Sequence, residues 1–206
     1  MNEFDIKANE WDKNNVHLER AQTIAIQIKQ RIPIRSGMKV MEFGAGTALL
    51  SFLLSDSFSS ITLIDNSPEM IRMSNGKIAE TNSSHIRTLK IDLETENLED
   101  KFDLIYSQMV FHHIADVDKM IHKLHSLLNE GGILAIADLY PEDGSFHGEG
   151  FTGHMGFDPE WLSGLMQHSG FKNISFSTCF LQKKTDPDGM QKEYPVFLII
   201  ATKISE

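Results

Sequence analysis

The chain has 206 residues, of which 41% are hydrophobic and 23% charged, and a formal net charge of −10. This length suits one domain, residues 1–206, and the acidic balance argues against a nucleic-acid partner, which needs clustered Lys and Arg. No apolar stretch approaches the about 20 residues that cross a bilayer, and residues 1–12 lack the apolar core of a secretory signal. The single cysteine, Cys179, cannot form an internal disulfide, so we expect a cytoplasmic protein.

Short β-like runs alternate with helical patterns along the chain, which predicts an α/β fold with a parallel sheet. In chain order we expect a helix at 16–32, a strand at 39–43, a helix at 47–54, a strand at 61–64, a helix opening at 67–69, strands at 86–91 and 103–107, a helix at 117–128, a strand at 133–137, a helix opening at 158–160, and strands at 174–181 and 194–202. The turn signal Asp186-Pro187-Asp188-Gly189 predicts that the last two strands form an antiparallel hairpin.

Residues 141–157 do not fit the regular pattern. Five of the chain's 14 glycines fall between Gly144 and Gly156, together with His147 and His154. An irregular segment of this length in a compact domain is usually functional or disordered. Because it follows a strand of a parallel sheet, it starts at the carboxyl edge, where ligands bind in open α/β folds. We therefore predict that this glycine-rich segment is a lid.

A candidate cofactor motif, Glu42-Phe43-Gly44-Ala45-Gly46, joins the first strand of the predicted sheet to the next helix. Glycine there lets the backbone turn sharply and approach a ligand closely. Asp65 follows 19 residues after Gly46, at the end of the next strand, where a carboxylate can accept hydrogen bonds from two ribose hydroxyls. The combination indicates a nucleoside cofactor, either a dinucleotide or S-adenosylmethionine.

The third position of the motif separates these two cofactors. The dinucleotide fingerprint G-x-G-x-x-G needs glycine where this chain has Leu49. In addition, Glu42 places an acid beside the turn, which is unfavourable for a pyrophosphate and favourable for an ammonium or a sulfonium. The sequence therefore favours S-adenosylmethionine over a nicotinamide cofactor.

Five motifs in order resemble the class I S-adenosylmethionine-dependent methyltransferases, specifically the small-molecule branch that includes enzymes of ubiquinone and menaquinone biosynthesis. They lie at residues 40–47, 64–70, 90–93, 102–107 with 112–114, and 128–134, and the likeness extends from Val40 through Gly170. The resemblance implies a Rossmann-like seven-stranded sheet in the order 3-2-1-4-5-7-6, with the seventh strand antiparallel and helices on both faces. It also implies methyl transfer to an oxygen, nitrogen or carbon atom of a small molecule.

The resemblance also implies roles for individual residues. Gly44, Ala45 and Gly46 are expected to contact the methionine portion of the cofactor, and Asp65 the ribose. The adenine is expected to meet Asn66, Met70, Asp92 and the backbone N–H of Leu93. Ser107 and Gln108 are expected to lie at the methionine ammonium or the ribose side, and His113 near the sulfonium. Residues 4–12 resemble the family's cap segment, so residues 1–35 are expected to form an N-terminal cap and helix, in which Trp11 either shields the cofactor or packs on its own helix.

The histidines leave alternatives open. His122 and His125, with His112-His113 just before them, lack the full ligand set of a zinc site, so we expect no metal. His147 in the glycine-rich segment is the candidate catalytic residue, either facing the acceptor or deprotonating it, although a sulfonium is so good a leaving group that placement alone can suffice. A non-catalytic S-adenosylmethionine-binding protein is the alternative from another class. The acceptor and the oligomeric state are not decoded by the sequence.

Overall fold

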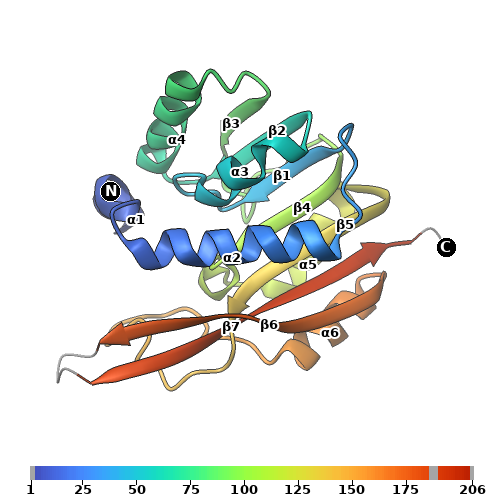
Figure 1. Cartoon of the computed structure of the whole chain (residues 1–206). Coiled ribbons are helices and arrows are strands. Elements are labelled where there is room, and N and C mark those ends of the chain that lie inside the picture. The colour runs from blue at the N-terminus through green and yellow to red at the C-terminus, as the bar shows by residue number, and fades with distance from the viewer. Residues whose placement is uncertain (1–2, 186–189, 205–206) are drawn as a thin grey trace.

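The computed structural model describes residues 3–185 and 190–204. Within these residues lies one seven-stranded sheet in the order β3-β2-β1-β4-β5-β7-β6. The pairings among β3, β2, β1, β4 and β5 are parallel, whereas β7 is antiparallel to both β5 and β6. The predicted topology, including the closing hairpin, is confirmed (Figure 1). The turn predicted at residues 186–189 lies outside the described residues.

The elements follow the predicted alternation. The strands are β1 (Lys39–Phe43), β2 (Ser60–Asp65), β3 (Ile86–Lys90), β4 (Phe102–Gln108), β5 (Leu128–Leu139), β6 (Phe171–Thr185) and β7 (Gln191–Lys203). The helices are α1 (Glu3–Trp11), α2 (Asn15–Arg31), α3 (Leu49–Leu54), α4 (Pro68–Thr81), α5 (Val117–Leu127) and α6 (Pro159–His168), with 3-10 turns η1 (Ser55–Ser57) and η2 (Phe111–His113). As predicted, the Ser67 side chain accepts from Met70 N–H at the start of α4, and Asp158 caps α6 in the same manner.

Helices cover both faces of the sheet, and each face has its own hydrophobic core. Ile24 of α2 and Leu50 of α3 belong to one cluster, against which Ile78 of α4 packs. Leu124 of α5 and Leu162 of α6 belong to the other cluster. Among the described residues, no helix combines the length and the apolar character that a bilayer crossing requires.

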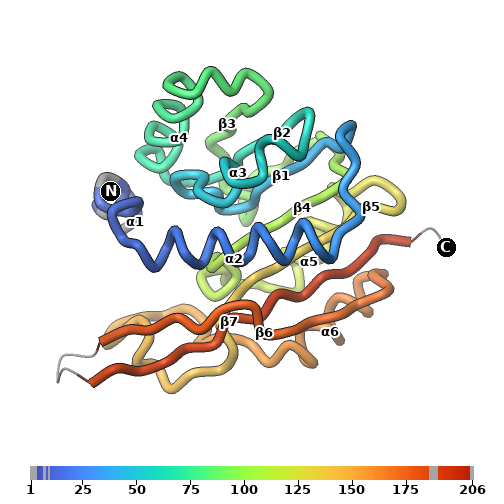
Figure 2. Tube along the Cα trace, in the orientation of Figure 1, coloured from blue at the N-terminus to red at the C-terminus, as the bar shows by residue number. Residues whose placement is uncertain are grey.

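Helix α1 was not predicted, and several element boundaries differ from the sequence prediction, three of them for reasons that the structure shows. The helix expected from residue 47 starts at Leu49, because Ala48 adopts a left-handed conformation with φ of 64°. β5 starts at Leu128, where a short pairing with Phe102 precedes a register shift. β6 runs to Thr185 because its pairing with β7 continues through polar residues, which the search for apolar runs missed. The two long strands project as a ribbon beyond the rest of the sheet (Figure 2).

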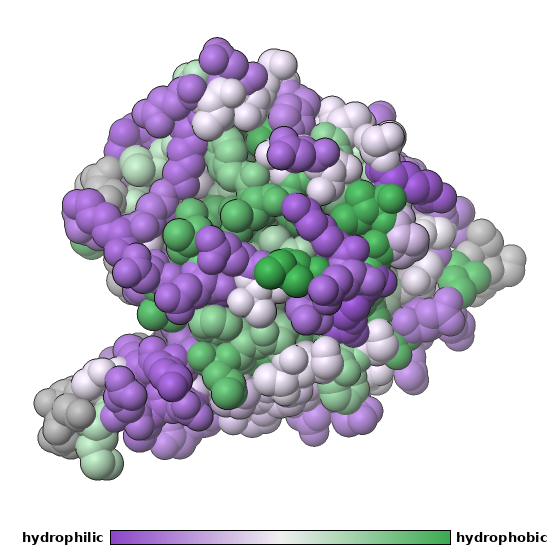
Figure 3. Space-filling view, viewed as in Figure 1, coloured by the Kyte–Doolittle hydropathy of each residue, from purple (hydrophilic) through white to green (hydrophobic). Residues whose placement is uncertain are grey.

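The surface of the α2–α3 face is mostly hydrophilic at its margins (Figure 3). Hydrophobic side chains gather in the centre of this view, over α2 and α3, and the projecting hairpin is largely hydrophilic. Lys183 and Lys184 of β6 are exposed there, and charged side chains on an edge strand oppose pairing with a further strand.

Candidate cofactor and acceptor site

The turn after β1 forms the centre of the candidate site. Gly44 has φ of +67°, and a Cβ built on it would lie 2.4 Å from a methyl group of Val110, just after β4. A side chain at this position would therefore clash with Val110 as well as strain the backbone. The close approach brings the turn after β1 against the residues that follow β4, so the ends of both neighbouring strands form one surface.

Asp65 ends β2 beside this turn. Its Oδ2 accepts a hydrogen bond from Gly46 N–H and its Oδ1 accepts one from Ser67 N–H, both at 2.8 Å. Burial raises the pKa of this carboxyl above its usual value, against the lowering effect of these N–H groups. An ionised carboxylate offers about four lone-pair directions, so two remain for further donors such as a ribose diol.

Glu42 lies beneath the turn and is completely buried. Its Oε2 accepts hydrogen bonds from the backbone N–H of Ser51 at 3.2 Å and from the Ser51 hydroxyl at 2.5 Å, and that hydroxyl lies 2.7 Å from the Tyr106 hydroxyl. Among the described residues, Glu42 Oε1 has no hydrogen-bond partner. Burial raises the pKa of Glu42 to about 8, against the lowering effect of the Ser51 hydrogen bonds and of Lys77.

The predicted adenine side of the site lies at the ends of β2 and β3. Met70 is buried, with its sulfur 3.9 Å from the place of a Cβ on Gly46, whereas Asn66 is exposed. Asp92 Oδ1 accepts from Glu94 N–H at 2.9 Å, which shapes the loop after β3. The Leu93 side chain is part of the hydrophobic core. The structure thus brings these residues to the same edge of the sheet as Asp65.

Ser107 and Gln108 end β4, next to the turn after β1. The Ser107 hydroxyl donates to the Phe43 carbonyl oxygen at 2.9 Å, which links the ends of β1 and β4. Gln108 Oε1 is buried and has no hydrogen-bond partner among the described residues. A buried polar atom without a partner is costly, and a ligand donor would satisfy it.

The N-terminal helix α1 lies over these loops, and the sequence analysis missed how it is held. The Ser67 hydroxyl donates to Asp5 Oδ1 at 2.6 Å. Asp12, just after α1, accepts from the Thr47 hydroxyl at 2.5 Å and pairs with Lys77 of α4 at 2.5 Å. These partners are far apart in sequence, so no local pattern signals them.

Phe4 of α1 contacts a candidate site residue. Its ring packs edge to face on His113, with centroids 5.1 Å apart. Trp11 packs on Phe4 and on His17, and remains half-buried. The shielding role of Trp11 therefore stays a prediction.

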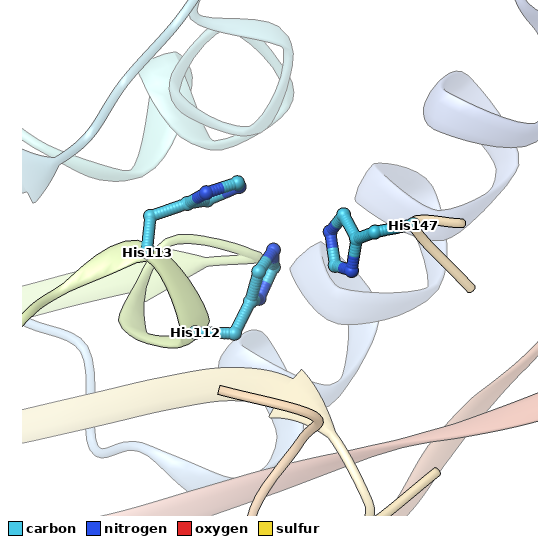
Figure 4. A group of neighbouring side chains, drawn as sticks. All are labelled: His112, His113 and His147. Atoms are coloured by element: carbon cyan, nitrogen blue, oxygen red, sulfur yellow. The ribbon is translucent and has the colours of Figure 1, made fainter. Parts of the chain in front are cut away.

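Three histidines converge between η2 and the glycine-rich segment (Figure 4). The rings of His112 and His113 lie 4.2 Å apart, and His147 lies 4.8 Å from His112 and 5.5 Å from His113, measured between centroids. His147 also stacks on Phe151 at 3.8 Å. His112 is buried and its Nδ1–H donates to Asp138 Oδ1 at 2.6 Å.

The environment of His147 bears on its predicted catalytic role. Burial, reinforced by the neighbouring His112 and His113, lowers the pKa of His147 to about 4. A general base works best with a pKa near the operating pH, so His147 is a weak proton acceptor here. His154 has a structural contact, since its Nε2–H donates to the Ile114 carbonyl oxygen at 3.0 Å.

A cavity of about 700 Å³ lies beside the histidines. Its lining includes side chains from η2 and from the glycine-rich segment, namely His113, His147, Glu149, Phe151, Thr152 and His154. Cavities of this size bind small molecules in many proteins. The segment's two ends are joined by a hydrogen bond from Glu142 N–H to Met155 O at 2.9 Å, and Phe157 N–H ties its last residue to Leu139 O of β5 at 2.8 Å.

The sheet order and the loops at its carboxyl edge define a Rossmann-like α/β protein. The family described as "Methyltransferase domain" matches residues 17–176. The chain belongs to this family of S-adenosylmethionine-dependent methyltransferases.

Individual relatives agree with this assignment. "Uncharacterized methyltransferase C1347.09" of Schizosaccharomyces pombe is 31% identical over 160 residues, covering 69% of this chain and 55% of that protein. "Malonyl-[acyl-carrier protein] O-methyltransferase 1" of Ilyobacter polytropus is 34% identical over 100 residues, covering 48% of this chain and 37% of its own. The chain thus spans about half or less of these relatives. The crystal structure of a SAM-dependent methyltransferase from Aquifex aeolicus shares the fold, with a TM-score of 0.70, 15% identity, and coverage of 97% of this chain and 98% of that one.

Proposed function

We propose that this chain transfers the methyl group of S-adenosylmethionine to an oxygen, nitrogen or carbon atom of a small molecule bound under the glycine-rich segment. The observation that carries the cofactor assignment is the pair of carboxyls, Glu42 and Asp65, on either side of the Gly44–Gly46 turn. Asp65 suits a ribose diol, and the buried Glu42 carboxyl, which ionises when a cation lies beside it, suits an ammonium or a sulfonium. The unpartnered buried atoms Glu42 Oε1 and Gln108 Oε1, counted among the described residues, fit a ligand that brings donors.

Different residues of this chain bind different parts of the cofactor. Gly44, Ala45 and Gly46 present backbone to the methionine portion, and Asp65 holds the ribose hydroxyls. Glu42 and Gln108 face the ammonium group, with Ser107 holding the strand end behind them. The adenine is covered by Met70 or Asn66 and is read by Asp92 and the N–H of Leu93. When bound, S-adenosylmethionine supplies an electrophilic methyl group on a positively charged sulfur.

The acceptor side is formed by His113, His147 and the cavity between η2 and the glycine-rich segment. His147 faces the acceptor and orients it, while desolvation under the segment leaves little need for a strong base. The volume of about 700 Å³ suits a small molecule. The Ilyobacter relative is named for methylation of an oxygen, which is within the range of acceptors proposed here.

We propose that residues 1–206 act as one methyltransferase domain, with residues 1–35 as a cap that includes Trp11 and residues 141–157 as a lid. The net charge of −10 supports a small-molecule acceptor rather than a nucleic acid. The single cysteine is buried and free, which supports a cytoplasmic location.

Titration with S-adenosylhomocysteine tests the cofactor assignment. We expect saturable binding by calorimetry and no binding of NADH. Asp65→Ala is expected to weaken the affinity by about 100-fold, because each lost hydrogen bond to a charged group costs about 1.5 to 3 kcal/mol. The matched control is Asp118→Ala, which removes an aspartate from α5 whose side chain is 52% exposed.

The other outcomes have clear meanings. Binding of NADH without binding of S-adenosylhomocysteine would favour a nicotinamide-binding protein and overturn the proposal. Binding of S-adenosylhomocysteine without turnover on any acceptor would favour a sensor or a partner subunit that binds the cofactor without catalysis.

A further inference from the structure

The three convergent histidines have the geometry of an incomplete metal site. Each of His112, His113 and His147 offers one ring nitrogen, and the three nitrogens all lie within 4.8 Å of one another. Figure 4 shows His112 and His113 reaching up from η2 while His147 points toward them from the opposite side. Ligands about 2.1 Å from a tetrahedral zinc ion lie roughly 3.4 Å apart, so a small closure of the rings suffices.

We propose that His112, His113 and His147 bind a divalent transition-metal ion of the zinc class beside the acceptor cavity. The sequence pattern favoured no metal, because 34 residues separate His113 from His147 and only the fold brings them together. Three neutral imidazoles form a common ligand set for zinc, and an open fourth position distinguishes a reactive site from a structural one.

The hydrogen bonds of His112 prepare it as a ligand. Its Nδ1–H donates to Asp138, which is buried at the end of β5 and also accepts from the His112 backbone N–H at 3.3 Å. This bond fixes the tautomer, so the lone pair of His112 lies on Nε2. A carboxylate behind a histidine is the usual second partner of a zinc ligand, because it orients the ring and makes the nitrogen more basic.

His147 is held in place by packing rather than by a hydrogen bond. Its ring stacks on Phe151 and contacts Phe146 edge to face at 4.7 Å. Its Nδ1 is buried and has no hydrogen-bond partner among the described residues. A buried nitrogen without a partner carries a free-energy cost, which a ligand bound at this ring nitrogen would offset.

The charges near the cluster are compatible with a cation. Asp138 is completely buried and accepts hydrogen bonds from both the ring and the backbone N–H of His112. Glu149 lines the same cavity. The buried Arg20, which interacts electrostatically with Asp138, already balances part of this charge.

The open fourth coordination position of the metal indicates a class of acceptor. This part of the inference rests on the proposed function. His113 and His147 line the cavity, so a metal held by them presents its open position there. Zinc at such a position binds and acidifies an O–H or S–H group. The acceptor class that fits is therefore a small molecule with an ionisable oxygen or sulfur.

Direct metal titration tests the proposal without cofactor or acceptor. Protein stripped with EDTA and dialysed is titrated with Zn²⁺ in competition with a chromogenic chelator, and Co²⁺ is used as a spectroscopic probe. We expect one equivalent of Zn²⁺ and the visible absorption bands of tetrahedral Co²⁺. His147→Ala is expected to weaken binding at least 100-fold, and Asp138→Asn about 10- to 100-fold.

His122→Ala is the matched control, since His122, His125 and His168 line a second cavity near Gly170. Its zinc affinity is expected to equal that of the unaltered protein, and thermal melting of all variants checks that they fold. Absence of Zn²⁺ and Co²⁺ binding, or binding that survives His147→Ala, would overturn the proposal. Because S-adenosylhomocysteine is absent from this titration, either proposal can fail without the other.

Discussion

Glu42→Gln is expected to stabilise the protein at alkaline pH. Between acidic and alkaline pH, the free energy of unfolding of the unaltered chain is expected to fall by about 3 to 5 kcal/mol more than that of Glu42→Gln. In the folded protein, burial raises the pKa of this carboxyl to about 8, against 4.5 as the ordinary value. Between these two values the unfolded chain loses the proton while the folded chain retains it. The unaltered protein therefore loses stability as the pH rises from about 4.5 to about 8, and glutamine removes that loss.

Urea unfolding at several values between about pH 5 and about pH 9 measures this difference directly. Glu149→Gln serves as the control, because it removes one carboxyl from an exposed position in the glycine-rich segment. Parallel curves for the unaltered protein and Glu42→Gln would show that the buried carboxyl stays ionised, contrary to the expectation.

The same carboxyl links cofactor binding to proton release. An ammonium group beside Glu42 favours the ionised form. Binding of S-adenosylhomocysteine at pH 7 is then expected to release protons, seen as a calorimetric enthalpy that changes with the ionisation enthalpy of the buffer. Glu42→Gln is expected to abolish the proton release that comes from this carboxyl.

Gly156→Ala is expected to destabilise the fold by about 3 kcal/mol or more and to lower the melting temperature by roughly 10 °C. Gly156 has φ of +76°, and a Cβ there would lie 2.1 Å from the Tyr140 carbonyl oxygen and 2.9 Å from that of Leu139. These atoms belong to the backbone at the end of β5, where Phe157 N–H donates to Leu139 O. They cannot move aside as a flexible side chain would.

Gly148→Ala separates the clash from the backbone strain. Gly148 also has a positive φ, of +85°, but a Cβ there meets nothing within 4 Å. Its cost is expected to be only the left-handed strain of about 1 to 2 kcal/mol. Equal melting temperatures for the two variants would mean that the end of β5 yields to the added methyl group.

Local patterns predicted most of the fold and the cofactor edge. Apolar runs identified all seven strands, and Ser67 and Asp158 identified two helix starts, because these signals depend on neighbours in the sequence. The glycine turn and Asp65 were selected for the same reason, and the structure brings them together. Boundaries were less accurate where a single residue decided them, as at Ala48, whose left-handed backbone has no signature in an alanine side chain.

Contacts between distant segments were beyond such patterns. Nothing near His147 in the sequence shows that it meets His112, and nothing near Asp5 shows that it binds Ser67. These contacts exist because β5 ends beside β4 and because α1 packs on α4, which are results of the whole topology. The burial that changes the proton affinity of Glu42 is likewise a property of the assembled core.

His113 is contacted by both helix α1 and the glycine-rich segment. Its ring is contacted by Phe4 of α1 at 5.1 Å and by Phe151 of the glycine-rich segment at 5.4 Å. Helix α1 and the glycine-rich segment come from distant parts of the sequence, yet both pack on this one imidazole. Because both contacts are edge to face on the same ring, we expect a displacement of either segment to change the packing of the other.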